Sequence, residues 1–533
     1  MPTYDTLKHA LRIVSLATPL LALTGFAAHQ PSSGSLAQAA ASSAPVEAPA
    51  PAIPVATPDA PAYGWRRPVP SSTSPLAGPG AAAARVENNG QQVLDWESGA
   101  GKSYLIPALE VTGFLIGLNI FDRIFLDDDR TGEGGRRTYY STTPTTWHHL
   151  RDQNWGFDQD PFNVNQFGHP YQGATMYGLA RSCGLGFWES WAYANVGSFA
   201  WKMAGETDRP SINDMVTTGN SGSLLGEALF RMSQLVLKEE QGPPDFWHEA
   251  AAAAISPPTG FNRLAFGDRF KTPFPSHDPA TFWRVRAGYM FNSEDDLTTD
   301  FQMSYGLPGQ PGYSYRRPLD YFDFQISGLA RSNNPIGNVL LRGLLYGKEY
   351  QAGEDYRGIW GIYGSYDYIS PTIFRVSTTA LSLGTTAQYW LSSRLALQGS
   401  VLAGVGFGAA GKTPTSDGQR DYHYGVTPQG IMSLRLLYGT RLALESVLRG
   451  YYVSGTGSDN AEGDEAIMRS NTNLLYRIFG RHGISLQYIH AVRNAQYGNL
   501  PARHQTDGTI GIFYTFLGDT HLGAVQWRDS SSD

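Results

Sequence analysis

The second half of the chain alternates between apolar and polar residues. In the segment 283–291 every second residue is apolar, while Arg284 and Arg286 lie between them. The same period of two returns in 322–327 and in 442–452. Because successive side chains of a strand point to opposite faces, this period predicts pleated strands with one apolar and one polar face.

About twelve such strands are predicted, and single-chain bacterial barrels have an even number of strands. The segments are 281–292, 298–308, 321–331, 337–350, 356–370, 373–391, 393–410, 422–439, 441–454, 465–480, 482–496 and 506–517. Short turns such as 391–394 are expected to face the periplasm, and longer polar connections such as 412–419 the outside. The predicted fold is α+β, mainly β: an antiparallel transmembrane β-barrel of about twelve strands, preceded by a small helical domain.

The composition agrees with a barrel in an outer membrane. Charged residues make up 16% of the chain, aromatic residues 12%, and there are 60 glycines. Tyr and Trp form interfacial girdles in such barrels, which accounts for the aromatic content. A soluble periplasmic β-protein is the alternative. The net charge of −7 and the lack of a basic run exclude nucleic acid as an expected partner.

The N-terminus predicts export. Residues 1–39 resemble a signal peptide, because Lys8 and Arg12 precede a short apolar stretch and an A-x-A sequence follows at 37–39. We therefore expect Sec-dependent export, with a membrane anchor as the alternative. Residues 40–98 are rich in Ala, Pro and Ser and predict a disordered linker. Cys183 is the single cysteine, so no internal disulfide and no cysteine-based zinc site can form.

Residues 99–256 predict a helical domain. The segment 104–125 is apolar nearly all round and must be buried in protein or membrane. The clearest helix is 221–238, on which Glu227 and Arg231 lie four residues apart. A linker is expected over 257–279, the barrel over 280–518 and a C-terminal tail over 519–533.

The final predicted strand resembles the C-terminal β-signal of outer-membrane proteins. The matching positions are Thr509, Gly511, Tyr514 and Phe516. This resemblance implies recognition by the barrel assembly machinery during biogenesis. The chain continues to Asp533, whereas the signal usually ends at its terminal aromatic residue.

A dense pattern of polar residues and glycines precedes the barrel. It consists of Asn165, Phe167, His169-Pro170-Tyr171, Gly173, Tyr177, Ala180-Arg181, Gly184, Ser190, Ser198, Trp201, Glu206, Pro210-Ser211, Asn213-Asp214, Thr218, Gly222, Gly226-Glu227 and Arg231. The segment of about 158–235 resembles a bacterial family known as domain of unknown function 3943. The resemblance implies a bacterial envelope protein and no assigned activity. Lys202 departs from the pattern, since an acidic residue is expected there.

Two interpretations of this segment remain open. Glycines cost a helix about 1 kcal/mol each relative to Ala, so close helix packing should compensate and should bury the charged residues. In the first interpretation these residues form a structural or functional polar network, in which the arginines neutralise the acids. Its members are Asn165, Tyr171, Arg181, Glu206, Asp214, Glu227 and Arg231.

In the second interpretation the segment is catalytic. His169 would be a general base for a serine such as Ser190, Ser198 or Ser211 in an envelope lipid hydrolase or acyltransferase. An acid such as Asp158 or Asp160 would orient the histidine. The sequence has no G-x-S-x-G elbow and no H-E-x-x-H motif. No metal site and no cofactor are predicted.

The favoured prediction is an outer-membrane β-barrel protein with a helical module on the periplasmic side or against the barrel mouth. Its role would be structural, or transport of a small molecule or lipid. A barrel of this size is narrow, so side chains or part of the module should fill its lumen. The expected partners are outer-membrane lipid, the assembly machinery and a small-molecule or lipid ligand.

Overall fold

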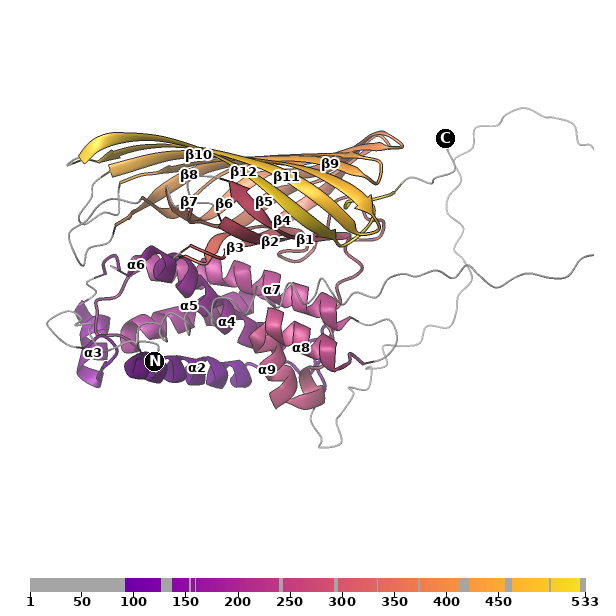
Figure 1. The fold of residues 1–533 in the computed structure, drawn as a ribbon. Helices are drawn as coiled ribbons and strands as arrows, with labels where there is room; N and C mark the ends of the chain where they lie inside the picture. The colour runs from indigo at the N-terminus through magenta and orange to yellow at the C-terminus, as the bar shows by residue number, and fades with distance from the viewer. Residues whose placement is uncertain are drawn as a thin grey trace, which may run out of the picture.

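The structure of the protein is a computed structural model. It describes residues 92–125, 137–152, 155–158, 160–238, 243–291, 296–332, 334–371, 374–411, 421–455, 463–497 and 500–527. The expected signal peptide and most of the expected linker lie outside these residues. Within them, a helical module is followed by a barrel (Figure 1).

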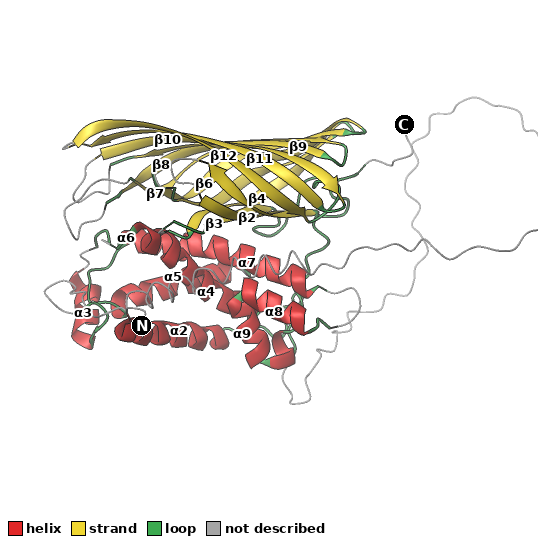
Figure 2. Cartoon of the chain, viewed as in Figure 1, coloured by secondary structure: helices red, strands yellow, loops and turns green. Residues whose placement is uncertain are grey.

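Twelve antiparallel strands close the barrel, as predicted, in the order β1-β12-β11-β10-β9-β8-β7-β6-β5-β4-β3-β2 (Figure 2). Their bounds are β1 Thr281–Phe291, β2 Asp296–Tyr305, β3 Phe322–Leu329, β4 Ile336–Ala352, β5 Tyr356–Ile369, β6 Val376–Ser392, β7 Leu395–Ala410, β8 His423–Tyr438, β9 Leu442–Val453, β10 Gly463–Phe479, β11 His482–Tyr497 and β12 Leu500–Leu517. Turns of two or three residues follow β4, β6, β8 and β10. We call this the short-turn end, and the opposite one the loop end.

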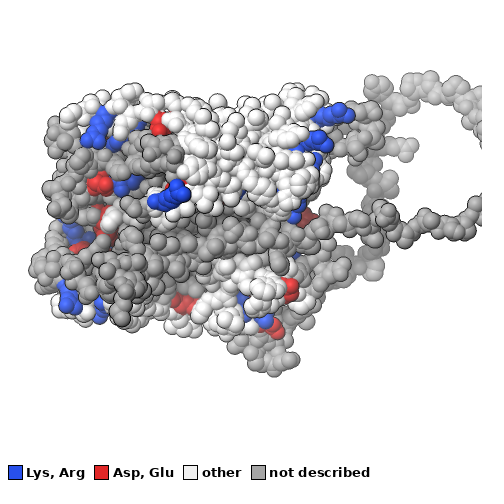
Figure 3. All heavy atoms as spheres, in the orientation of Figure 1, with Lys and Arg blue, Asp and Glu red and all other residues white. Residues whose placement is uncertain are grey.

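The alternation of the strands separates an apolar outside from a polar lumen. On β9 to β12 the outward side chains are exposed and apolar: Leu444, Leu448, Leu474, Ile484, Leu486, Ile510 and Ile512. Figure 3 shows a broad area of the visible barrel surface without charged side chains. Exposed aromatic residues gather near the short-turn end, namely Tyr389, Tyr438, Tyr476, Phe479 and Tyr514. An apolar band with an aromatic girdle is typical of a barrel that spans a membrane.

The wall of the barrel is lowest at the loop end of β1 to β3. These strands have 11, 10 and 8 residues, whereas β12 has 18. β1 pairs with β12 only from Ile510 to Leu517, so residues 500–509 of β12 extend beyond it. The predicted β-signal thus lies in the strand that closes the barrel against β1.

The helices of the module lie alongside the barrel (Figure 1). Their bounds are α2 Leu105–Phe125, α3 Thr143–Asp152, η2 Val164–Gly168, α4 His169–Ser182, α5 Phe187–Ala204, α6 Ile212–Asp214, η3 Met215–Ser221, α7 Gly222–Leu237, α8 Phe246–Ile255, α9 Pro257–Ala265 and η4 Gly267–Phe270. The glycines allow close helix packing, as predicted. A Cβ on Gly173 would lie 1.8 Å from the carbonyl oxygen of Thr218 and 3.1 Å from the Cα of Gly222.

The module packs against the outer wall of the barrel. Outward side chains of β2 to β5 are buried in the same hydrophobic core as side chains of α4 and α7; they include Phe301, Met303, Phe324, Ile326, Val339, Leu341, Tyr366 and Tyr368. Gly364 on β5 faces Leu224 of α7, whose Cδ2 would be 3.0 Å from an added Cβ. The expected position was the periplasmic side or the barrel mouth, but the contacts run along the wall.

The C-terminal tail folds back into the lumen at the short-turn end. Gln388 and Trp390 donate hydrogen bonds to the carbonyl of Val525, at 2.7 and 3.1 Å. Leu522 and Val525 are buried among Phe282, Leu437 and other lumenal residues. The residues after the β-signal therefore close this end of the barrel.

One expected boundary is wrong. The segment 257–279 was predicted to be a linker, but it contains α9 and η4. Pro257 and Pro258, which suggested a break, occupy the first turn of α9. Proline is tolerated there, because the first helical N–H groups have no partner within the helix.

Candidate functional site

Buried Lys202 organises the first charge cluster of the module. Its Nζ lies 2.5 Å from Asp214 Oδ2, 2.7 Å from Glu206 Oε2 and 3.8 Å from Asp158 Oδ2. Lys202 is 2% exposed and Asp214 is fully buried. Helix α5 holds the lysine one turn before Glu206, which explains that pair, whereas Asp214 arrives from α6. Lys202, the departure from the family pattern, is therefore the counter-ion of the acids.

His169 belongs to the same cluster. It begins α4, with Nδ1 3.2 Å from Gln172 Oε1 and Nε2 3.5 Å from Asp214 Oδ1. Burial by itself would raise the pKa of the Asp158 carboxyl, but the Lys202 ammonium, His169 and a backbone N–H hold that pKa below its usual range. The acid in contact with His169 Nε2 is Asp214, whereas Asp158 or Asp160 was predicted to orient the histidine.

Three side chains of this cluster have the spacing of cation ligands. Carboxylate oxygens of Asp158 and Asp160 and a ring nitrogen of His169 all lie within 4.8 Å of one another. The Lys202 ammonium already provides positive charge next to Asp158. The ammonium and the carboxylates form one network of charges, and the histidine is part of it.

The candidate serines make other contacts. Ser198 Oγ donates to the backbone carbonyl of Asp214 at 3.4 Å. Ser190 Oγ, in the first turn of α5, is buried without a hydrogen-bond partner among the described residues. Ser211 Oγ donates to Asp214, the acid beside His169. Within the described part of the chain, the contacts of His169 include none of the three serines. The structure therefore does not assemble the predicted serine–histidine pair there.

A second charge cluster joins the module to the barrel. Glu227 accepts hydrogen bonds from Arg181 Nε at 2.8 Å and Arg231 Nε at 2.7 Å. Arg231 also donates to Asp320 Oδ1 at 2.8 Å, in the connection between β2 and β3. Tyr177 adds a hydrogen bond to Glu227 at 2.7 Å. The pairing of both arginines with one acid was among the predicted alternatives, but the contact with the barrel was not.

Asn165 and Tyr171, the remaining predicted network residues, lie around η2 and α4. Asn165 Nδ2 donates to the hydroxyl of Tyr422 at 2.8 Å, and so connects the module to residues at the loop end of the barrel. The ring of Tyr171 stacks on Phe167 at a centroid distance of 6.4 Å. The predicted polar network therefore divides into two clusters and this contact to the wall.

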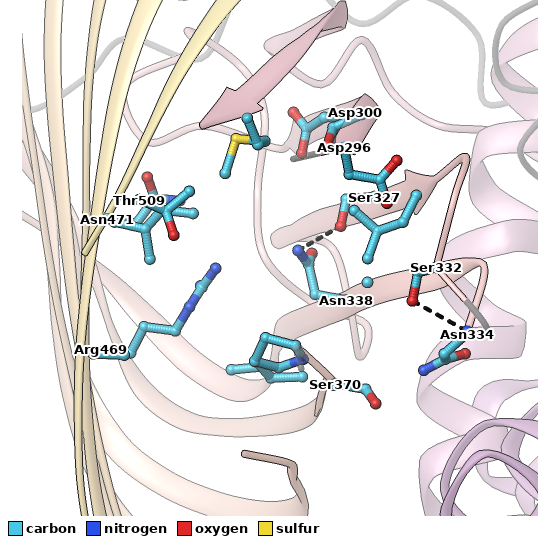
Figure 4. Close-up of a pocket in the computed structure, with 18 of the residues that line it drawn as sticks. Asp296, Asp300, Ser327, Ser332, Asn334, Asn338, Ser370, Arg469, Asn471 and Thr509 are labelled. Atoms are coloured by element: carbon cyan, nitrogen blue, oxygen red, sulfur yellow. Dashed lines mark hydrogen bonds between the residues drawn. The ribbon is translucent and has the colours of Figure 1, made fainter. Parts of the chain in front are cut away.

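A cavity of about 630 Å³ lies in the lumen near the loop end. Strand residues line most of it, and Phe162 and Asn163 of the module reach it where the wall is low. Figure 4 shows Arg469 pointing into this space, with Asp296, Asp300, Asn338 and Thr509 around it. The alternation of β10 indicates that Arg469 faces the lumen, but nothing in the sequence distinguishes it from the other lumenal arginines.

Ion pairs and hydrogen bonds cross the lumen below this cavity. Arg284 on β1 lies 2.5 Å from Glu445 on β9. Tyr451 on β9 donates to Asp367 on β5 at 2.7 Å, and Gln429 on β8 donates to Ser365 on β5 at 3.0 Å. Because these strands are not neighbours, the contacts fill the lumen with side chains, as predicted for a narrow barrel.

Residues 154–258 match the family described as domain of unknown function DUF3943. No curated protein matches the chain. Solved structures with a similar barrel include the NanC porin, which is 8% identical with a TM-score of 0.24, over 44% of this chain and 98% of that one.

Two further barrels are similar at the same level. The Acinetobacter baumannii outer membrane protein Omp33 is 9% identical, with a TM-score of 0.19, over 45% of this chain and 99% of that one. OmpT of Vibrio cholerae is 9% identical, with a TM-score of 0.17, over 44% and 96%. These similarities concern the fold of an outer-membrane β-barrel alone.

Proposed function

We propose that the barrel is a closed scaffold that holds the helical module in the plane of the outer membrane. The observation that carries this proposal is the burial of one side of the outer wall beneath the module. On the remaining strands the same outward positions are apolar and exposed. A helix bundle on this surface lies beside the barrel, at the depth of the lipid chains.

The exposed face of α2 supports this position. Its 21 residues would extend roughly 30 Å, the thickness of a hydrocarbon core. By length and composition it is the one described helix that could cross a membrane. Its exposed large side chains are Leu105, Leu109, Ile116, Ile120, Phe121, Ile124 and Phe125. Thr112 Oγ1 donates to the carbonyl of Ala108 at 2.8 Å, so its hydroxyl is satisfied within the helix.

The polar groups of α2 turn away from this face. Asn119 Nδ2 donates to the carbonyls of Gly205 and Tyr139, at 2.7 and 3.0 Å. Asp122 is buried, and Glu110 accepts a hydrogen bond from Asn262 at 3.3 Å. A helix with an apolar outer face, whose strongly polar side chains bond within its own bundle, is typical of one that faces lipid.

The contents of the lumen favour a scaffold over an open diffusion pore. The contacts between opposite strands and the C-terminal tail occupy the lumen below the loop-end cavity. If the short turns face the periplasm, as in related barrels, the tail closes the periplasmic end.

Spin-label accessibility tests the position of the module. Cys183 is buried and is replaced by Ser, and single cysteines are introduced at Ile116 on α2, at Val401 on the lipid-facing side of β7 and at Ser393 in a short turn. In the protein reconstituted into bilayers, the labels at Ile116 and Val401 should collide with oxygen and not with a water-soluble nickel chelate. The label at Ser393 should behave in the opposite way. Nickel accessibility of Ile116 equal to that of Ser393 would overturn the proposal.

Conductance measurements test the closed lumen. The full-length protein in planar bilayers should give no stepwise ion conductance, because polar contacts and the tail fill the lumen. Regular conductance steps would instead support the transport alternative and remove the scaffold proposal.

A further inference from the structure

The lumenal cavity contains a buried arginine without a protein counter-ion. Arg469 is 8% exposed and lines the cavity. Among the residues that the structure describes, it has neither an ion pair nor a hydrogen bond, whereas Arg286, Arg342 and Arg493 each pair with an acid. Its guanidinium points into the open space (Figure 4).

A second arginine lies beside Arg469. Arg449 lies directly opposite it on β9, in the register of the two strands. Asp367 and Asp300 act on Arg469 electrostatically without a direct ion pair. Asp367 is already engaged, since its Oδ2 lies 3.9 Å from Arg449 Nε and accepts a hydrogen bond from Tyr451. Like charges directly opposite each other destabilise a sheet, and a buried charge without a partner is costly. This arrangement therefore costs stability in the free protein.

Further polar atoms with unused hydrogen-bonding capacity surround the same cavity. Thr298 Oγ1 and Asn338 Oδ1 are buried without hydrogen-bond partners within the described part of the chain. Both residues line the cavity, as do apolar side chains such as Phe374 and Leu329. A ligand with hydroxyl groups and an apolar edge would satisfy these neighbours.

We infer that this cavity is a binding site for an organic anion, whose carboxylate or phosphate is held by Arg469. The guanidinium supplies paired N–H donors for two oxygens of the anion. Hydroxyl groups on the body of the ligand bind Thr298 and Asn338. The volume of about 630 Å³ accommodates a compact molecule of sugar size. The anion comes either from solution or from a lipid head group, since the chemistry is the same.

Calorimetry on the full-length protein tests the site. The probes are inorganic phosphate, gluconate as a hydroxylated carboxylate, and glucose as the neutral control. Arg469→Gln removes the guanidinium, and Arg394→Gln makes the same change at an exposed short turn. We expect gluconate and phosphate to bind the wild type and Arg394→Gln equally, and Arg469→Gln about tenfold more weakly or worse, since hydrogen bonds to charged groups are strong.

Stability separates a ligand site from a structural arginine. Without ligand, Arg469→Gln should unfold at the same or a higher temperature than the wild type, because it removes the repulsion from Arg449. Loss of stability in this variant, unchanged anion affinity, or the same affinity for glucose as for gluconate would overturn the inference.

Measurements in nanodiscs distinguish an anion from solution from a lipid head group. The wild type is compared in discs of phosphatidylcholine alone and in discs that also contain lipopolysaccharide. If free phosphate binds more weakly in the discs with lipopolysaccharide, and if this difference disappears in Arg469→Gln, the occupant is a lipid head group. Equal binding in both discs identifies an anion from solution, and each result supports the site.

Discussion

Two sides of one barrel wall differ in what covers them. On β9 to β12 the outward positions carry Leu and Ile that remain exposed, as at Leu444 and Ile512. On β2 to β5 the outward side chains are instead buried under the helical module, as at Phe324 and Tyr366. Hydrophobicity does not separate the two sides, because both are apolar.

Two features distinguish the contact with the module: tyrosine hydroxyls that hydrogen-bond to it, and a glycine that leaves room for one of its side chains. Tyr366 donates a hydrogen bond to the carbonyl of Gln166 at 2.6 Å, and Tyr424 accepts one from Gln166 at 3.1 Å. Gly364 leaves room for Leu224. On the exposed side Gly450 has no atom within 4 Å of an added Cβ. A lipid-facing wall thus becomes a protein interface through hydroxyl groups and a single missing side chain.

The largest effect is expected from breaking the charge cluster that ties the module to the covered side. Glu227→Ala leaves Arg181 and Arg231 buried without their shared acid, which should cost about 3–5 kcal/mol. Hydrogen exchange of the α7 amides should report faster opening, while the heat-modifiable migration of the barrel stays unchanged. Glu97→Ala, at an exposed acid of the module, serves as the control. Unfolding of barrel and module together would contradict this separation.

A medium effect is expected from filling the space at the interface. Gly364→Leu should overpack Leu224 and destabilise the contact between the module and the barrel by about 1–3 kcal/mol. Gly450→Leu makes the same substitution at an outward position of the exposed side and should leave stability unchanged. Both are measured by thermal unfolding in detergent micelles. Equal effects at the two sites would show that the module does not occupy this wall.

The smallest effect is expected from removing a single hydroxyl. Tyr366→Phe loses the hydrogen bond to Gln166 and should cost about 1 kcal/mol. Tyr488→Phe, at an exposed outward position of β11, should have no measurable effect. Hydrogen exchange in η2, next to Gln166, provides the readout. A protection pattern identical in both variants would show that the hydroxyl contributes nothing to the contact.

Much of the fold is predictable because the local pattern specifies it. Period-two alternation predicts twelve strands, and their parity assigns Arg284 and Arg286 to the lumen, where both form ion pairs. Apolar spacing on 221–238 predicts helix α7. The candidate site is only partly predictable. Burial of the charged segment follows from its glycines, but the role of Lys202 depends on Asp214, which approaches it from a different helix.

The sequence by itself determined which side chains share a face, because that depends only on the periods of strand and helix. It therefore established the barrel, its polar lumen and an apolar helical module. Only the tertiary structure decided what each face meets. The covered side of the wall, the tail in the lumen and the lone Arg469 depend on contacts between segments far apart in the chain. Closing the barrel brings these segments together, and the local periodicity of the sequence does not specify which segments will meet.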